Sequence, residues 1–552
     1  MIRRRVLWAA LLVLPFGLGW WAGRGGASSD LYSNLDVFVE VIHKVQDNYV
    51  DPVDATKLID GALKGMLASL DPYSQFMDRH AFQNLVAVTD GHYGGVGLMV
   101  TVRDRWPSVI SPIEGGSAWE AGVRPGDVIV EIDGKSSAGL SLDEVADRLR
   151  GDAGTRVRLG VRAEGEDSTR TFVLERRDIV TRSVPYAFLL DRGVGYVRLS
   201  NFSETSGSEV RAAVARLAGE GAHSLILDLR GNPGGVLEQA VNVSEQFLPK
   251  GALVVSKRGR AAGQDARYYA SGTRPNLDWP MAVLVDAGSA SASEIVAGAL
   301  QDLDRAVLVG QTSFGKGSVQ KVYPLVGGTE ALKLTTALYY TPSGRSIHKL
   351  HGAALAAADD SGEEDDNPDA DTVAVAPAAP ARPRFHTAAG RVVYGGGGVT
   401  PDAEVPVDSL PPLVLDLERG ALPFRFANRW SNAHPNAPED AGTKAPRTAK
   451  GSAAATAWDA PLAPAVWSGF VAFVHAERPV VSQAALEAER PRLERAVRRE
   501  LARRTAGDAA AARVAFEKDP VVRRALDALT KARAPRDVFV AARPSKAESA
   551  TP

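Results

Sequence analysis

Residues 281–295 read MAVLVDAGSASASEI, and this stretch decides the fold class. The apolar run 281–285 is typical of a buried strand, the small residues after it predict a tight turn, and a helix follows from Ser293. The segment 224–235, SLILDLRGNPGG, shows the same order of strand and turn. Because such runs alternate with helical segments from 194 to 347, the sequence predicts an α/β layered core.

The elements expected in this core are short. We predict strands at 194–199, 224–229, 281–285 and 306–309, and helices at 208–219, 237–247 and 293–303.

Regions of different character flank the core, so we predict a multidomain protein that combines α+β and α/β parts. Apolar residues at four-residue spacing, such as Val37 and Val41, predict an N-terminal helical layer. Short strands with turn signals precede the core, and Ser141 with Glu144 predicts a capped helix among them. A later stretch rich in Ala, Asp, Glu and Pro cannot bury enough apolar surface to fold, which predicts a disordered insertion. In chain order we expect a signal anchor or signal peptide at 1–27, the helical layer at 31–87, a strand-rich domain at 88–176, the core at 177–350 and 385–410, the insertion at 351–384, and a linker with a helical C-terminal extension at 411–552.

The composition is that of an ordinary globular protein, with 45% hydrophobic and 24% charged residues. The formal net charge is −2, so we expect no nucleic-acid partner. The chain has no cysteine, which excludes disulfides, cysteine nucleophiles and thiolate metal sites. It also lacks the His-Glu-x-x-His pattern of zinc peptidases, and we expect neither a metal nor another cofactor.

The first residues indicate export. Arg3, Arg4 and Arg5 precede an apolar run from Val6 to Ala22, and a basic start before such a run is typical of an export signal. The run is short for a spanning helix, so a cleaved signal peptide is the alternative to an uncleaved anchor. Tryptophans near both ends of the run favour the anchor. Either way, the rest of the chain is expected outside the cytoplasm.

Three serines, Ser289, Ser291 and Ser293, lie where the buried strand gives way to a helix. A serine at a helix N-terminus meets free N–H groups and the positive end of the helix dipole, which favour an anion. The alternative is structural, because Ser291 and Glu294 have the spacing of a capping box. These residues alone leave both interpretations open.

Residues 310–320 read GQTSFGKGSVQ, one residue short of a phosphate-binding loop. Gly317 stands where that motif needs a Ser or Thr for magnesium, and a strand is expected next instead of a helix, so we exclude nucleotide binding. In a strand, Lys316, Ser318 and Gln320 would share one face. Desolvation there favours the neutral lysine, which can deprotonate a serine. The alternative is a solvated lysine on an edge strand.

Residues 227–235 read LDLRGNPGG, a buried strand that ends in a turn suited to glycine. Consecutive glycine N–H groups in such a turn can form an oxyanion hole, whereas the alternative is a plain strand–turn–helix connection. None of the nine histidines lies in a catalytic motif. A serine peptidase built on these segments would therefore need a lysine as its base.

Together, these segments resemble the carboxyl-terminal processing peptidases, also called tail-specific proteases. The resemblance covers about residues 35–347 and 385–405 and implies a serine endopeptidase with a crotonase-like layered core. The motifs that carry it are Leu70–Ser74, Leu229–Gly235, Gly288–Ile295, Phe314–Gly317 with Gln320, Tyr339–Arg345 and Gly398–Asp402.

The resemblance also implies roles for single residues. Ser291, the middle serine of its run, is implied as the nucleophile and Lys316 as its general base. Gln320 is implied to orient the lysine. The backbone N–H groups of Gly235 and Ala292 are implied to form the oxyanion hole.

The strand-rich domain at 88–176 resembles a PDZ domain, in which backbone N–H groups hold a free C-terminus and the peptide adds as a strand. Val145 and Leu149 are the residues expected from the helix of this domain, and for one of the two the alternative role is core packing. The family further implies that tail binding helps to switch the protease on. The residues expected at the peptide-binding site are Gly95, Val96, Gly97, Leu98, Val145 and Leu149.

Two functions follow from these observations. The first is an endopeptidase that cleaves the C-terminal tails of exported or envelope proteins, and the second is a non-catalytic PDZ scaffold or adaptor. Intact Ser291, Lys316 and Gln320 favour the first. The expected partners are unstructured substrate tails, an activating adaptor and a second copy in a homodimer. The expected location is the periplasmic side of a bacterial cell envelope, either anchored in the inner membrane or secreted after signal cleavage.

Overall fold

The computed structural model describes residues 26–163, 166–272, 279–349, 382–406, 409–434 and 462–542. The predicted signal segment at 1–27 and the predicted insertion at 351–384 lie almost wholly outside these residues. Within the described ranges, no helix has both the length and the apolar character that crossing a membrane requires. Two compact units divide the chain: residues 1–82 with 320–335, and residues 83–319 with 336–552.

The first unit is helical at its start, as predicted for residues 31–87. Asp54 caps its second helix by accepting a hydrogen bond from the Thr56 N–H at 2.9 Å. A short strand, β1 (Gln75–Met77), follows and pairs antiparallel with the first part of β18. The helices of the first unit are α2 (Gly26–Asn48) and α3 (Ala55–Ala68). The unit also contains residues of the strands β17 (Ser318–Pro324) and β18 (Ala331–Tyr340). Helix α4 (Arg79–Asp90) leads into the second unit.

The second unit begins with a small β-domain, residues 92–180. Its main sheet has the order β3-β4-β5-β7-β8, and β2 pairs with β9. The predicted capping box is present, because Ser141 and Glu144 exchange both hydrogen bonds at the start of α6. The elements are β2 (His92–Gly95), β3 (Leu98–Arg103), β4 (Trp106–Pro112), α5 (Ser117–Glu120), β5 (Val128–Ile132), β6 (Lys135–Ser136), α6 (Leu142–Leu149), β7 (Arg156–Arg162), β8 (Thr169–Glu175) and β9 (Arg177–Val180).

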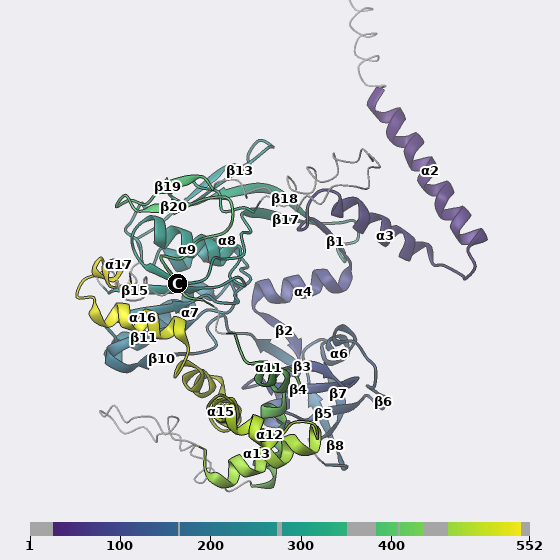
Figure 1. Ribbon diagram of the computed structural model, residues 1–552. Helices are drawn as coiled ribbons and strands as arrows, with labels where there is room; N and C mark the ends of the chain where they lie inside the picture. Colours follow the sequence, from purple (N-terminus) through teal and green to yellow (C-terminus); the bar gives the residue numbers. More distant parts are fainter. Residues whose placement is uncertain are drawn as a thin grey trace, which may run out of the picture. The chain divides into compact units, whose positions relative to one another are not determined.

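A six-stranded sheet lies in the second unit, in the order β10-β11-β12-β15-β16-β21. Its strands β10, β11 and β15 are labelled in Figure 1. All neighbours are parallel except β10 and β11. The four predicted core strands are confirmed, with ends that differ by one residue at most. The strands are β10 (Ala187–Leu190), β11 (Val194–Arg198), β12 (Ser224–Asp228), β15 (Met281–Val285), β16 (Val307–Gly310) and β21 (Ala403–Glu404).

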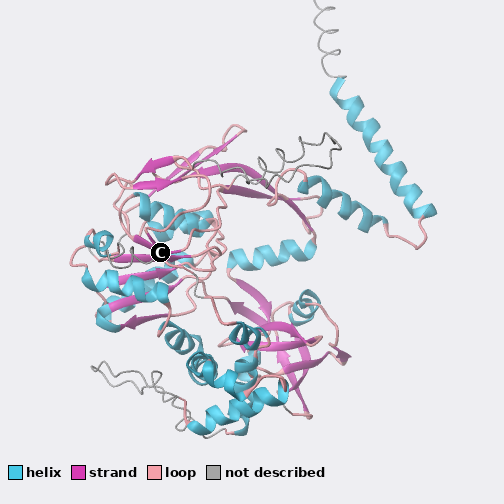
Figure 2. Ribbon diagram, in the orientation of Figure 1, coloured by secondary structure: helices cyan, strands magenta, loops and turns pink. Residues whose placement is uncertain are grey.

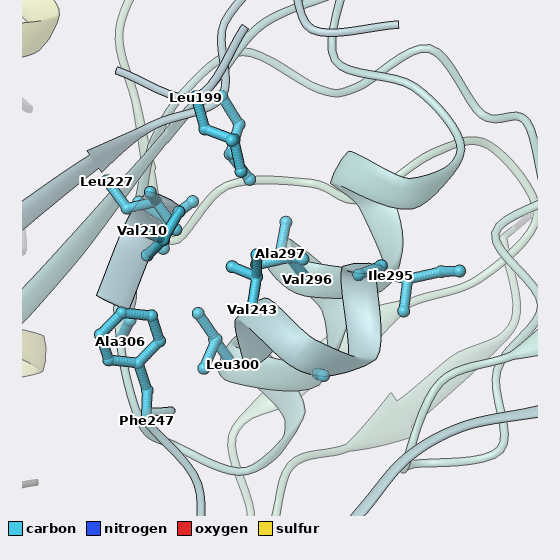
Figure 3. Close-up of a cluster of buried hydrophobic side chains, with 14 of the residues drawn as sticks. Leu199, Val210, Leu227, Val243, Phe247, Ile295, Val296, Ala297, Leu300 and Ala306 are labelled. Carbon is cyan, nitrogen blue, oxygen red and sulfur yellow. The ribbon is translucent and has the colours of Figure 1, made fainter. Parts of the chain in front are cut away.

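Alternate side chains of these strands enter two different cores. One face packs against α7 (Ser206–Gly219), α8 (Leu237–Ser244) and α9 (Ala292–Asp302), where Val296 and Leu300 are fully buried (Figure 3). The other face packs against α16 (Pro520–Lys531), whose Val522 is also fully buried. Since parallel strands are normally covered on both faces, α16 supplies the layer that the core would otherwise lack. Figure 2 shows helices on both sides of these strands.

The end of the C-terminal helical region therefore belongs to the core, a placement that its composition did not reveal. Helix α15 is interrupted at Gly507, where φ is 81°. A separate apolar cluster around Phe426, Trp467 and Phe470 joins the helices before this break. The region consists of α11 (Pro412–Arg419), α12 (Leu422–Ala433), α13 (Pro464–Glu477), α14 (Gln483–Ala488), α15 (Arg490–Phe516), α16 and α17 (Asp537–Ala541).

Candidate active site

Ser291 lies at the N-cap of α9, directly after the turn that follows β15. Its backbone angles are φ 56° and ψ −114°, a region that residues other than glycine rarely adopt. An ordinary N-cap has extended angles, so helix capping alone does not account for this conformation. Strain of this kind costs about 1–3 kcal/mol and is concentrated at functional sites.

The structure distinguishes Ser291 from the two serines beside it. Ser289 is fully buried and its hydroxyl donates to the Leu229 carbonyl at 2.9 Å. Ser293 is also fully buried and its hydroxyl donates to the Asn232 carbonyl at 2.9 Å. Ser291 alone of the three is partly exposed. Burial thus points to the same serine as the family resemblance.

Asn232 fixes the glycine turn against the serine turn. Its backbone carbonyl accepts from the Ala290 N–H and the Ser293 hydroxyl, both at 2.9 Å, on either side of Ser291. Its side-chain oxygen accepts from the Gly234 N–H at 2.9 Å. The fully buried Asn232 therefore links the two segments that sequence analysis singled out separately.

Gly234 lies in contact with the segment around Ser291. It has φ 94°, and a Cβ atom there would lie 2.8 Å from both the Ala292 nitrogen and the Ser291 Cβ. The next residue, Gly235, has φ 147°, and a Cβ there would lie 2.1 Å from the Phe202 carbonyl oxygen. Both positions require glycine, and the turn brings Gly234 close to Ala292 at the start of α9.

Lys316 lies in the loop before β17, two residues before the strand begins. The expectation that Lys316, Ser318 and Gln320 share one strand face is therefore wrong for the lysine. Gly315 precedes it with φ 92°, a left-handed conformation that ends regular strand pairing. A strand follows this loop, as expected, whereas a phosphate-binding loop would be followed by a helix.

Glu294 connects Ser291 and Lys316 through their backbones. Its Oε2 atom accepts from the Ser291 N–H at 2.8 Å and from the Lys316 N–H at 2.9 Å. Its Oε1 atom accepts from the Gly315 N–H at 2.7 Å and from the Ser313 hydroxyl. Burial raises the pKa of Glu294, although these hydrogen bonds act in the opposite direction. From the sequence alone, Glu294 is recognisable only as a capping partner of Ser291.

Tyr339 makes a second connection between the same two residues. Its hydroxyl lies 2.7 Å from the Lys316 carbonyl oxygen and 3.1 Å from the Ser291 carbonyl oxygen. The side chain is 1% exposed, so it can move little. Glu294 thus binds the N–H groups of Ser291 and Lys316, and Tyr339 contacts their carbonyl oxygens.

Gln320 lies on β17 in the first unit, where its side chain joins a short chain of hydrogen bonds. Its Nε2 donates to Thr335 Oγ1 at 3.2 Å, and that hydroxyl donates to Asp71 Oδ1 at 3.0 Å. Asp71 also accepts from Ser74 Oγ at 2.6 Å. Burial raises the pKa of Asp71, but these hydrogen bonds outweigh it and leave the pKa below its usual value. The side-chain amide of Gln320 is thereby oriented.

The predicted carboxylate-binding loop lies between β2 and β3. The Val96 and Gly97 carbonyl groups accept from the N–H groups of Ala118 and Ile113, at 3.1 and 2.8 Å. Among the described residues, neither the Val96 nor the Gly97 N–H donates to another backbone group. Gly95 ends β2 and Leu98 begins β3. The binding of a C-terminal carboxylate by this backbone stays a prediction.

The two residues expected from the helix of this domain lie in its apolar core. Val145 is fully buried and Leu149 is 5% exposed, and both pack in one cluster with Ile129 and Leu159. Core packing therefore explains the burial of both residues, although it was expected to account for only one of them. Their contact with a peptide stays a prediction. In the described ranges, no three histidine or acidic side chains gather closely enough to hold a metal ion.

Comparison with known proteins identifies the family. The sequence model of peptidase family S41 matches residues 193–353, that of the PDZ domain matches residues 108–163, and that of the activating protease CtpB N-terminal domain matches residues 24–81. The small β-domain is therefore a PDZ domain.

Three curated relatives agree with this result. A carboxy-terminal-processing protease of Bartonella bacilliformis is 43% identical over 323 residues, which are 58% of this chain and 74% of the relative. The carboxy-terminal processing protease CtpA of Bacillus subtilis is 35% identical over 321 residues, or 57% and 67% of the two chains. A carboxyl-terminal-processing protease of Synechocystis is 39% identical over 297 residues, or 52% and 68%. This chain belongs to peptidase family S41 and is a serine protease of the carboxy-terminal processing group, which acts on C-terminal tails.

Proposed function

We propose that Ser291 is the nucleophile of this protease and that neutral Lys316 is its general base. The observation that carries the proposal is the shared acceptor Glu294, which binds the N–H groups of both residues. The strained backbone of Ser291 and its partial exposure support the same assignment.

The chemistry follows from these groups. Lys316 takes the proton of the Ser291 hydroxyl while the Ser291 oxygen forms a bond to the scissile carbonyl carbon. The N–H groups of Gly235 and Ala292 stabilise the oxyanion, with help from the dipole of α9. The C–N bond then breaks, and the lysine ammonium returns the proton to the leaving amine. Water, deprotonated by the same lysine, attacks the acyl ester, and the lysine ammonium returns that proton to the Ser291 oxygen as the ester bond breaks.

Gln320 is proposed to orient the lysine through its side-chain oxygen. The support is local, because its nitrogen is committed to Thr335 and Thr335 is held by Asp71. An amide with one end fixed offers its other end in a defined direction.

The PDZ domain is proposed to select the tail. The donors of Val96 and Gly97 would bind the terminal carboxylate, and the peptide would add along β3 from Leu98. We also propose an envelope location, based on the basic and apolar start of the sequence.

A homodimer is proposed on the basis of α2. Large apolar side chains on this helix are exposed, including Leu31, Tyr32, Leu35 and Val39 at 60%, 67%, 46% and 51%. Apolar surface of this extent normally marks an interface. Light scattering of the full chain and of a Leu35→Glu, Val39→Glu variant tests this, because only the variant should be monomeric.

Cleavage of an unfolded protein tests the catalytic proposal. Lys316→Ala should abolish cleavage, whereas the matched control Lys321→Ala should cleave at the wild-type rate because Lys321 is an exposed lysine. Undiminished cleavage by Lys316→Ala would refute the mechanism. Sequencing of protein C-termini in cells with the wild type or Ser291→Ala would then identify the substrates.

A further inference from the structure

An ion pair joins the glycine turn of the active site to the C-terminal helical region. Arg230 Nη1 donates to Asp519 Oδ2 at 2.7 Å, across 289 positions of sequence. The two side chains are only 20% and 17% exposed. Ion pairs that are largely shielded from solvent are screened less by salt than fully exposed ones. The contact is therefore suited to holding Arg230 in one geometry.

Arg230 is the first residue of the turn, and two carboxylates hold its side chain from different sides. Its Nη2 donates to the buried Asp228 at 2.7 Å, while its Nη1 faces Asp519. Its backbone N–H donates to Asp228 at 2.9 Å. The next N–H, of Gly231, donates to Asp286 at 2.7 Å. The Arg230 guanidinium, held in this way, keeps the start of the turn in place where it leaves β12.

Asp519 is itself held rigidly because its two oxygens have separate tasks. Oδ1 accepts from the N–H groups of Val521 and Val522, at 2.9 and 3.1 Å, and so caps α16. Oδ2 accepts from Arg230. The capped helix is anchored by Val522 and Ala525, which are fully buried against the central sheet. The carboxylate that meets Arg230 is therefore attached to the layer that covers the sheet.

We propose that Asp519 is a positioning residue for catalysis, which acts through Arg230 to hold the glycine turn at the correct distance from Ser291. The turn reaches the serine segment through Asn232, whose carbonyl binds the Ala290 N–H. The inference rests on the proposed oxyanion role of Gly235 and Ala292. It gives the helical region beyond the matched peptidase residues 193–353 a part in the active-site geometry.

Two substitutions in the full chain separate capping from positioning. Asp519→Asn keeps an oxygen for the cap, because Asn is as good an N-cap residue as Asp, but it removes the charge that Arg230 meets. Asp519→Ala removes both. Asp508→Asn is the control, because Asp508 pairs with Arg503 at 3.1 Å in the same region and is 55% exposed. The measurements are kcat and KM for a tail peptide, the thermal unfolding temperature, and the affinity of a peptide boronate that mimics the oxyanion.

Positioning predicts that kcat falls about tenfold in both Asp519 variants, with KM within about twofold, because a displaced oxyanion donor weakens only the transition state. Boronate affinity should fall in parallel, while the unfolding temperature should drop in Asp519→Ala alone. A wild-type kcat in Asp519→Asn would overturn the inference and leave Asp519 as a helix cap. Failure of the proposed Ser291–Lys316 mechanism would give a different result from failure of this inference, because Ser291→Ala or Lys316→Ala would then still cleave.

Discussion

The backbone N–H groups of Ser291 and Lys316 donate to the same carboxylate oxygen of Glu294, at 2.8 and 2.9 Å. The residues are distant in sequence, and this oxygen makes their backbones neighbours. A Ser–Lys pair needs such a frame because a flexible lysine side chain loses much rotational freedom when it is held in one geometry. The frame fixes the starting points of both side chains, so less ordering is left for the moment of reaction.

Glu294→Gln should lower kcat by about 100-fold. The amide keeps one acceptor but turns an NH2 group toward backbone N–H donors, which separates the Ser291 and Lys316 segments. Peptide cleavage and thermal unfolding measure the effect, with Glu220→Gln as the control because Glu220 forms an exposed pair with Arg216. Wild-type kcat in Glu294→Gln would show that the shared acceptor is not needed.

The same residue predicts a pH dependence of stability. Because burial raises the pKa of Glu294 above its value in the unfolded chain, its contribution to stability is present at acidic pH and is lost as the pH rises through the raised pKa. The Gln variant lacks this titration. Unfolding in urea at a series of pH values should therefore show wild type losing stability relative to Glu294→Gln from acidic to neutral pH. A pH-independent difference between the two proteins would contradict the assignment.

Tyr339→Phe should lower kcat by about tenfold and stability by about 1 kcal/mol, because it removes only the hydroxyl that contacts the Ser291 and Lys316 carbonyls. Tyr340→Phe is the neighbouring control. Equal activity of the two variants would mean that the hydroxyl contact does not affect catalysis.

Gly234→Ala should abolish activity and cost about 3 kcal/mol of stability. Its Cβ would lie 2.7 Å from the Ala290 oxygen and 2.8 Å from the Ala292 nitrogen, in a tightly packed turn. Gly344→Ala shares a positive φ of 84° but meets open space, so it should cost only about 1 kcal/mol of strain. Chemical unfolding and cleavage assays of both variants distinguish the clash from the strain. Similar behaviour of the two would argue against the close packing of the turn on Ser291.

Much of the fold follows from the sequence, because its elements are continuous and local. The strand β15 is an unbroken apolar run and β12 has an apolar centre; both strands are buried along their whole length, and both were predicted. Ser141 and Glu144 also met the expectation of a capping box, since three residues suffice to define it. The role of α16 was missed, because its amphipathic pattern does not say which apolar face it covers.

The candidate site shows the same limit. Ser291 and Lys316 could be found from local motifs together with a family resemblance. Glu294 could not be assigned more than a cap, because its bonds to Gly315 and Lys316 depend on how two loops meet in space. The contact between Arg230 and Asp519 likewise joins residues that no local pattern relates.

Trapping of the acyl-enzyme tests the central claim most directly. A peptide ester would be mixed with the full chain, quenched in acid, and the modified residue located by mass spectrometry. The Ser–Lys mechanism predicts an acyl group on Ser291 alone and its loss in Lys316→Ala. Acylation of Ser289 or Ser293, or acylation of Lys316→Ala at the wild-type rate, would contradict the mechanism.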